Sequence, residues 1–208
     1  DFYKGWSFHL GDVDGGEKAD LNATGWRVLN LPHDWSIEGQ FSKDNPATPE
    51  GGALPGGIGW YRKTFTVPAV SKDKQVFIDF DGVYQKSDVW VNGHHLGFRP
   101  NGYISFRYEL TPYLKFGGSN TIAVKVDNSS QPNSRWYSGS GIYRNVWLVT
   151  TNKDVSVSHW GTYVTTPQVS NDAATVHIQT NINTNNVKHQ DLKLVTTIVD
   201  KAGKTAGV

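Results

Sequence analysis

The sequence contains no cysteine and no methionine. Without a thiol, the chain can form no disulfide, no thiolate metal site and no cysteine nucleophile. The absence of methionine leads us to expect a processed or excised piece of a longer protein. No apolar run approaches the length of a membrane span, and no signal peptide is recognisable. We therefore expect a soluble chain with no membrane partner, and a periplasmic or secreted location stays open.

An excess of charge of one sign is also missing. The 20 Lys and Arg residues nearly balance the 19 Asp and Glu residues, and no block of like charge occurs. This balance argues against a nucleic acid or an anionic membrane surface as a partner. Large apolar side chains are plentiful instead. The 8 Trp, 9 Tyr and 9 Phe residues supply enough apolar area for a true core.

Helical patterns are scarce, and the dominant period of the sequence is two, which is typical of half-buried strands. Asn92-Gly93 lies between two such runs, and this dipeptide favours a tight hairpin turn with positive φ at both residues. One short helical turn is expected at 111–114, with Thr111 as N-cap and Pro112 at the first helical position. The Gly- and Pro-rich segments 46–52 and 54–59 are expected to form a long loop. The predicted strands of this part are 60–67, 75–80, 88–91, 94–98, 104–110, 121–126 and 146–150.

The composition changes near residues 150–154. Aromatic residues and glycine are common before this point, whereas Asn, Thr and Val dominate after it. Alternating segments predict further strands at 155–164, 174–180 and 191–199, with a hairpin turn at 200–204. An immunoglobulin-like sandwich takes about seven strands and about 100 residues. We therefore expect the second domain to be truncated, and an all-β chain overall.

The segment 133–149 carries the strongest functional signal. Its loop places two adjacent aromatic residues beside polar side chains and then continues into a strand, and binding residues are often held on such loops. A sugar ring can pack on an aromatic face while its hydroxyls bond to polar neighbours. The alternative is a structural corner, in which Trp136 plugs the sandwich and Arg144 satisfies carbonyl groups. The candidate substrate-binding residues are Asn133, Ser134, Arg135, Trp136 and Tyr137.

Several motifs, taken in order, resemble the amino-terminal part of glycoside hydrolase family 2, the β-galactosidase group. The resemblance covers about the first 150 residues well and the rest weakly. The segments that carry it are Leu-Pro-His-Asp-Trp at 31–35, Gly-Ile-Gly-Trp-Tyr-Arg-Lys-Thr-Phe at 57–65, Phe-Asp-Gly-Val at 80–83, Val-Trp-Val-Asn-Gly at 89–93, Ser-Arg-Trp-Tyr at 134–137 and Gly-Ile-Tyr-Arg at 141–144.

The resemblance implies a jelly-roll (galactose-binding-like) β-sandwich at 1–150, followed by part of an immunoglobulin-like β-sandwich at 151–208. It also implies that a (β/α)₈ barrel beyond this chain carries two catalytic glutamates of a retaining hydrolase. The chain would then be a non-catalytic fragment that lines the active-site rim and braces that barrel. Its implied ligand is a β-galactoside or a related glycan, since β-glucuronidases and β-mannosidases share the architecture. The alternative is a stand-alone carbohydrate-binding module.

No catalytic residue, metal site or cofactor is expected within the chain itself. A retaining glycosidase needs two carboxylates about 5 Å apart, whereas the four glutamates are widely spread, at Glu17, Glu38, Glu50 and Glu109. The resemblance places 33–35 near the joint with the barrel, and Trp35 is expected to pack in the interior. In some members an Asp near the loop contacts substrate and sodium, but here Asn133 and Ser134 precede Arg135. Sodium binding is therefore doubtful, and any contact would be a neutral hydrogen bond.

Two pairs of residues are candidate metal ligands, and the signal for each is weak. His94 and His95 follow the hairpin turn, and a hairpin tip offers too few ligands for a metal, so both are expected to be exposed. Asp79 and Asp81 have the spacing that places side chains on one sheet face, which leaves a structural calcium ion as an open alternative.

Overall fold

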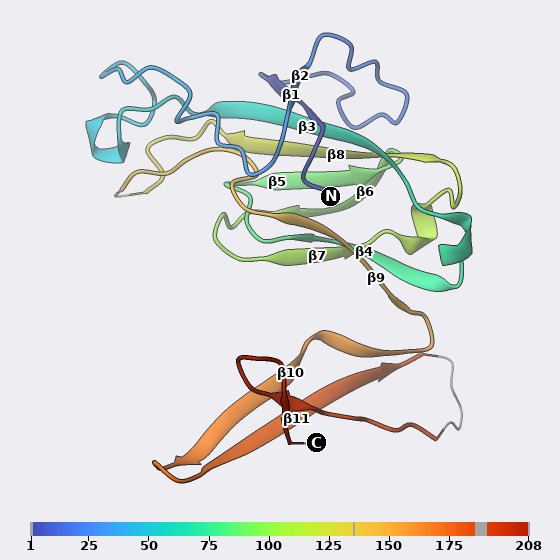
Figure 1. Cartoon of the computed structure of the whole chain (residues 1–208). Helices are drawn as coiled ribbons and strands as arrows, with labels where there is room; N and C mark the ends of the chain where they lie inside the picture. The colour runs from blue at the N-terminus through green and yellow to red at the C-terminus, as the bar shows by residue number, and fades with distance from the viewer. Residues whose placement is uncertain (1, 135, 186–190, 208) are drawn as a thin grey trace. The chain divides into compact units, whose positions relative to one another are not determined.

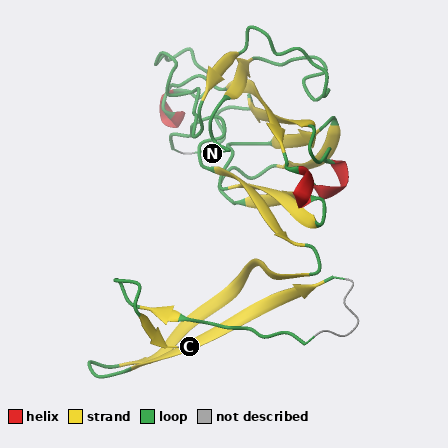
Figure 2. Ribbon diagram, turned by 45° about the vertical axis from the view of Figure 1, so that its right-hand side comes forward, coloured by secondary structure: helices red, strands yellow, loops and turns green. Residues whose placement is uncertain are grey.

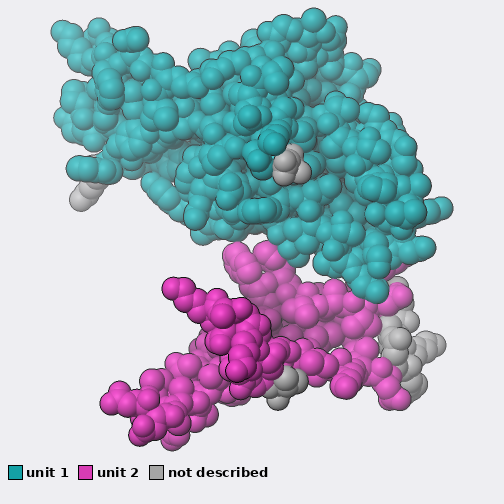
Figure 3. Space-filling view, viewed as in Figure 1, with its two compact units in different colours: residues 1–152 teal, residues 153–208 magenta. Residues whose placement is uncertain are grey.

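The computed structural model describes residues 2–134, 136–185 and 191–207. The chain forms two compact units, residues 1–152 and residues 153–208, which Figure 3 colours separately. Strands dominate both units (Figure 2), and the helical segments of the described residues are three single 3₁₀ turns at Pro49–Gly51, Ala69–Ser71 and Thr111–Tyr113. The expected all-β class is confirmed.

The first unit is a sandwich of two antiparallel sheets (Figure 1). A six-stranded sheet has the order β2-β1-β3-β8-β5-β6, and a three-stranded sheet has the order β7-β4-β9. The strands are β1 (Trp6–Leu10), β2 (Arg27–Leu29), β3 (Gly57–Thr66), β4 (Lys74–Phe80), β5 (Ser87–Val91), β6 (His94–Arg99), β7 (Phe106–Glu109), β8 (Ser119–Asn128) and β9 (Val146–Asn152).

The period-two pattern decides which side chains fill the core. On β3, Tyr61 and Phe65 are buried among the apolar residues of the core. Trp60 and Arg62, the alternate residues, lie on the opposite face, where burial depends on loops that cover the sheet. Strand β3 pairs with β8 along its full length. These two strands lie at the centre of the six-stranded sheet.

The hairpin between β5 and β6 forms as the Asn-Gly signal predicts. Asn92 and Gly93 have φ values of 50° and 84°, so both central residues adopt the left-handed conformation that the tight turn requires. The helical turn at 111–113 is also present, but its N-cap is Leu110. The expected capping role of Thr111 is therefore wrong. Its hydroxyl instead accepts a hydrogen bond from the backbone N–H of Val76.

The second unit contains a long antiparallel pair, β10 (Val155–Val169) and β11 (Ala174–Thr184). A small hairpin of β12 (Ile198–Val199) and β13 (Thr205–Gly207) follows, joined by the expected turn at 200–204. The prediction of a strand over 191–199 is wrong for 191–197, which are irregular. Alternating residues there, Leu192 and Leu194, are half exposed, because no described strand pairs with this segment. The immunoglobulin-like nature of this unit stays a prediction.

Candidate functional site

The loop after β8 is organised by hydrogen bonds from its own polar residues. The Asn133 amide donates to the side-chain oxygen of Asn128 at 2.6 Å and to the carbonyl of Ser130 at 3.0 Å. Its side-chain oxygen accepts a hydrogen bond of 3.0 Å from the Tyr84 hydroxyl. Asn133 therefore ties the loop to the end of β8 and to the segment before β5.

Trp136, in the same loop, is open to solvent. The Trp136 side chain is 80% exposed, so it does not plug the sandwich in this structure. The Ser134 hydroxyl donates a hydrogen bond to the backbone carbonyl of Trp136. Arg135 lies outside the described residues. Arg144 is exposed and donates no hydrogen bond to a carbonyl within the described part of the chain.

Asp34 anchors the part of the loop at residues 137–140. One of its carboxylate oxygens accepts hydrogen bonds from the backbone N–H groups of Ser36, at 2.9 Å, and Ser140, at 2.8 Å. The other oxygen accepts a hydrogen bond of 3.0 Å from the Tyr137 hydroxyl. The carboxylate lies where a Cβ atom on Gly139 would be, so any side chain at that position would displace it.

A pocket of about 200 Å³ opens beside this carboxylate. It is defined by phenol rings around one acid, and we name it the Asp34 pocket: its lining residues are Asp34, Tyr84, Tyr103, Tyr137, Ser138, Gly139 and Tyr143. The rings of Tyr84 and Tyr103 meet edge to face, with centroids 5.4 Å apart. Burial and the hydrogen bond to Asp34 raise the pKa of Tyr137 to about 12. The Tyr137 phenol therefore stays protonated at neutral pH and keeps its hydrogen bond to Asp34.

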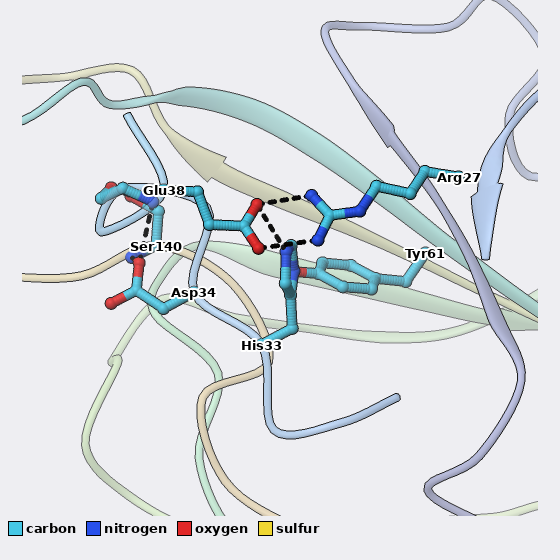
Figure 4. Close-up of polar contacts among 7 residues, drawn as sticks. Arg27, His33, Asp34, Glu38, Tyr61 and Ser140 are labelled. Carbon is cyan, nitrogen blue, oxygen red and sulfur yellow. Dashed lines mark hydrogen bonds and ion pairs between the residues drawn. The ribbon is translucent and has the colours of Figure 1, made fainter. Parts of the chain in front are cut away.

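A chain of polar contacts, exposed at Arg27 and buried at His33 and Tyr61, lies next to Asp34 in the sequence (Figure 4). The Arg27 guanidinium binds both carboxylate oxygens of Glu38, at 2.6 and 2.8 Å, and holds the pKa of Glu38 at about 2. His33 contacts Glu38 through Nε2 at 3.3 Å and the Tyr61 hydroxyl through Nδ1 at 2.7 Å. Burial lowers the pKa of His33. A neutral imidazole with its proton on Nε2 then accepts from Tyr61 and donates to Glu38.

Two buried serines fix the segment after Asp34 against the loop. The hydroxyl oxygens of Ser36 and Ser140 lie 2.6 Å apart, and the Asn128 amide donates to Ser140 at 2.7 Å. Ser36 also contacts the carbonyl of Pro55 at 2.6 Å, which ties in the long Gly- and Pro-rich loop. Three segments far apart in sequence are thus joined at one end of the sandwich.

The structure brings together only part of the set predicted from sequence. Tyr137 lines the Asp34 pocket and Asn133 positions the loop beside it, whereas Ser134 and Trp136 do not line it. Sequence reasoning missed Asp34, although it lies in one of the motifs of the family resemblance. It also missed Tyr84 and Tyr103, which carry no signal because nothing in the sequence shows that they face residue 137.

The other candidates have structural partners. Trp35 is 3% exposed and packs in the core, as expected, while His94 and His95 are exposed. Asp79 forms an ion pair with Arg107, with both carboxylate oxygens within 2.7 Å of guanidinium nitrogens. Asp81 accepts a hydrogen bond of 3.0 Å from the indole of Trp147. Within residues 2–134, 136–185 and 191–207, no group of His, Asp and Glu side chains could hold a metal ion, and no helix is long and apolar enough to cross a membrane.

Phenol rings around a carboxylate, at the end of an antiparallel sandwich, form the kind of pocket that suits a polyhydroxylated ligand. A family model described as "Glycosyl hydrolases family 2, sugar binding domain" matches residues 44–152. The chain belongs to this family, and the resemblance seen in the ordered motifs is confirmed.

Known relatives extend well beyond this chain. The β-galactosidase BoGH2A of Bacteroides ovatus is 50% identical over 204 residues, which cover 98% of this chain and 24% of that protein. A putative β-glucuronidase of Formosa agariphila is 45% identical over 87% of this chain and 17% of its own length. The crystal structure of a β-glycosidase from Bacteroides vulgatus matches with a TM-score of 0.88 and 46% identity, over 99% of this chain and 26% of that one. The chain thus spans about a quarter or less of these relatives.

Proposed function

We propose that this chain is the non-catalytic amino-terminal part of a retaining β-galactosidase-like hydrolase. In that role, residues 1–150 form its jelly-roll sugar-binding domain and residues 151–208 part of an immunoglobulin-like domain. The loop at 133–139 contributes to the rim of the active site, and the rest of the unit braces the catalytic barrel. Support comes from the family membership and from the quarter-length coverage of relatives that are glycosidases.

The chemistry of the Asp34 pocket favours a neutral sugar. Asp34 is the charged residue among those that line the pocket, and none of the described lining residues is basic. A glucuronide would bring a second carboxylate toward Asp34, and like charges repel. A galactoside instead offers hydroxyl groups, which can donate hydrogen bonds to Asp34 and to the phenol oxygens. We therefore propose a β-galactoside rather than a β-glucuronide because the described lining residues include the Asp34 carboxylate and no basic side chain.

Two of the four glutamates, Glu38 and Glu50, are poor candidates for the general acid. A general acid in a retaining glycosidase needs a raised pKa, whereas Arg27 holds the pKa of Glu38 at about 2. Glu50 is exposed and bonds to the hydroxyl of Thr48, and this hydrogen bond lowers its pKa. We therefore propose that the chain alone hydrolyses no glycoside.

The test compares two proteins made in parallel, namely this chain and the same chain extended by its natural downstream sequence. Both are assayed with p-nitrophenyl β-galactoside and p-nitrophenyl β-glucuronide. We expect no turnover by the short chain, and β-galactoside turnover by the extended protein. Turnover by the purified short chain would overturn the non-catalytic assignment. A preference of the extended protein for the β-glucuronide would overturn the substrate assignment.

A further inference from the structure

A second, larger pocket lies on the outer face of the six-stranded sheet, and it shares no lining residue with the Asp34 pocket. Its volume is about 640 Å³. Trp60 of β3 and Trp90 of β5 contribute its aromatic part, so we name it the Trp60–Trp90 groove. The two strands are separated by β8, and side chains that point outward from all three meet on this face.

The two indoles stack because the strand between them carries a small residue. Ala123 of β8 is paired with Trp90 on β5, while Trp60 is paired with Lys125 one step along the same face. The two rings stack with centroids 5.4 Å apart and an interplanar angle of 23°. Trp60 is 3% exposed, whereas Trp90 is only partly buried and keeps an accessible surface.

One wall of the groove is a loop fastened to the sheet. Arg62, 4% exposed, donates to the carbonyls of Gly16 at 2.5 Å and Lys18 at 2.9 Å. The Trp60 ring lies where a Cβ atom on Gly16 would be, at 2.8 Å, so only glycine allows the loop to approach this closely. Asp12 then accepts hydrogen bonds from the Trp60 indole, at 2.9 Å, and from Lys125, at 2.8 Å. The wall is therefore held in place before any ligand arrives.

The charges of the groove are mostly negative. Its lining includes the carboxylates of Asp12, Asp14, Glu17 and Asp88 against the single ammonium group of Lys125. Asp12 is paired with Lys125, and Asp88 contacts His95 at 2.7 Å. In contrast, Asp14 and Glu17 form no side-chain hydrogen bond within the described residues. Two hydrogen-bond acceptors thus remain beside an accessible indole.

These features select one ligand chemistry. Lys125 already lies 5.6 Å from the Trp60 ring centroid and binds Asp12, so the place that a cationic ligand would take is filled. An anionic ligand would meet an excess of carboxylates. The Trp90 ring lies between Trp60 and His95, whose centroid is 5.2 Å away. A neutral pyranoside can pack its C–H groups on the part of Trp90 that stays accessible and donate its hydroxyl protons to Asp14 and Glu17.

We propose that the Trp60–Trp90 groove is a second glycan-binding site, which takes neutral hexopyranosides and excludes uronates. This proposal does not depend on the proposed function, because the groove lies within the described chain and needs no catalytic barrel.

The test is a titration of the ¹⁵N-labelled 208-residue chain with methyl β-D-galactopyranoside, and separately with methyl β-D-glucuronide, followed by NMR. We expect the neutral glycoside to shift the indole N–H resonances of Trp60 and Trp90 with millimolar affinity. The glucuronide should leave both resonances unchanged. Trp90→Ala should weaken binding of the neutral glycoside about tenfold, since a stacked ring is lost.

The matched control is Trp147→Ala, which removes a half-exposed indole from β9 of the other sheet and should leave the affinity unchanged. The double change Asp14→Asn and Glu17→Gln alters only exposed or partly exposed side chains, and it tests the proposal even if Trp90→Ala does not fold. It should weaken neutral binding several-fold and admit the glucuronide. Shifts that avoid Trp60 and Trp90, equal affinity for both glycosides, or equal losses in Trp90→Ala and Trp147→Ala would each overturn the proposal.

Discussion

The hydroxyl of Tyr137 donates a hydrogen bond of 3.0 Å to Asp34, across 103 residues of sequence. The same carboxylate also accepts hydrogen bonds from two backbone N–H groups, so it joins the loop at 133–139 to the segment that follows β2. Hydrogen bonds to a charged acceptor contribute more to stability than hydrogen bonds to a neutral one, and removal of the acceptor leaves its donors without a partner. Asp34 is therefore both the anchor of the loop and the charged wall of the pocket.

Asp34→Ala should destabilise the chain more than Tyr137→Phe does. The alanine leaves the N–H groups of Ser36 and Ser140 unpaired, which costs about 1–3 kcal/mol, whereas the phenylalanine removes a single hydrogen bond at a partly exposed position. Urea unfolding of both variants measures the difference. Tyr3→Phe, at another half-exposed tyrosine, serves as the control and should have no effect. Equal losses for Asp34→Ala and Tyr137→Phe would show that Asp34 does not anchor the loop through its backbone contacts.

The ion pair of Arg27 and Glu38 should make stability depend on pH in the acid range. The pKa of Glu38 is lowered to about 2 in the folded chain, from an ordinary value of 4.5. A lowered carboxyl pKa stabilises the folded state above the unfolded pKa, and this contribution is lost as the pH falls from 4.5 toward 2.

Glu38→Gln isolates this effect. The difference in unfolding free energy between the parent chain and Glu38→Gln should be largest above pH 4.5 and shrink as the pH approaches 2. Urea unfolding at a series of pH values measures it, with Glu109→Gln at the exposed end of β7 as a control that shows little change. A difference that stays constant across this range would contradict the low pKa of Glu38.

Gly139→Ala should disturb the Asp34 pocket specifically. A methyl group at this position would overlap the Asp34 carboxylate, so the carboxylate or the loop must move. We expect a Tm lower by several degrees in the chain and a lower kcat/KM in the extended protein. Gly118→Ala is the matched control, since its Cβ would make only ordinary contacts, at 3.4 Å or more, with Lys115. A Gly139→Ala variant that behaves like Gly118→Ala would show that the loop does not pack this closely on Asp34.

Local signals in the sequence predict much of this fold. Alternation locates the central strands, and the Asn92-Gly93 turn needs only the two residues that form it. Strands β1 and β2 were not predicted, and β2 is only three residues long. The irregular segment 191–197 shows that alternation can also predict a strand that does not form. Its alternating leucines would form a strand only where another strand supplied hydrogen bonds.

The candidate site is predicted less completely than the fold. The loop at 133–137 is recognisable because its candidate binding residues are adjacent in sequence. The contact of Asp34 with Tyr137 and the stack of Trp60 on Trp90 depend instead on how distant strands pair. Such contacts follow from register and strand order, which no local pattern specifies.

Trp136 provides the clearest test of the proposed role of the loop at 133–139. Its side chain is 80% exposed, so Trp136→Ala should leave the Tm of this chain nearly unchanged. If the ring packs against a sugar in the extended protein, its loss should remove about 1–3 kcal/mol of transition-state binding, or about ten- to a hundred-fold in kcat/KM. Trp160→Ala is a matched control, because Trp160 is 76% exposed and belongs to the second unit. Asn133→Ala is a less selective probe, since Asn133 also holds the loop to Tyr84 and Asn128. A Trp136→Ala enzyme with unchanged kcat/KM would show that the exposed ring does not contact substrate, and the rim assignment of the loop would then be wrong.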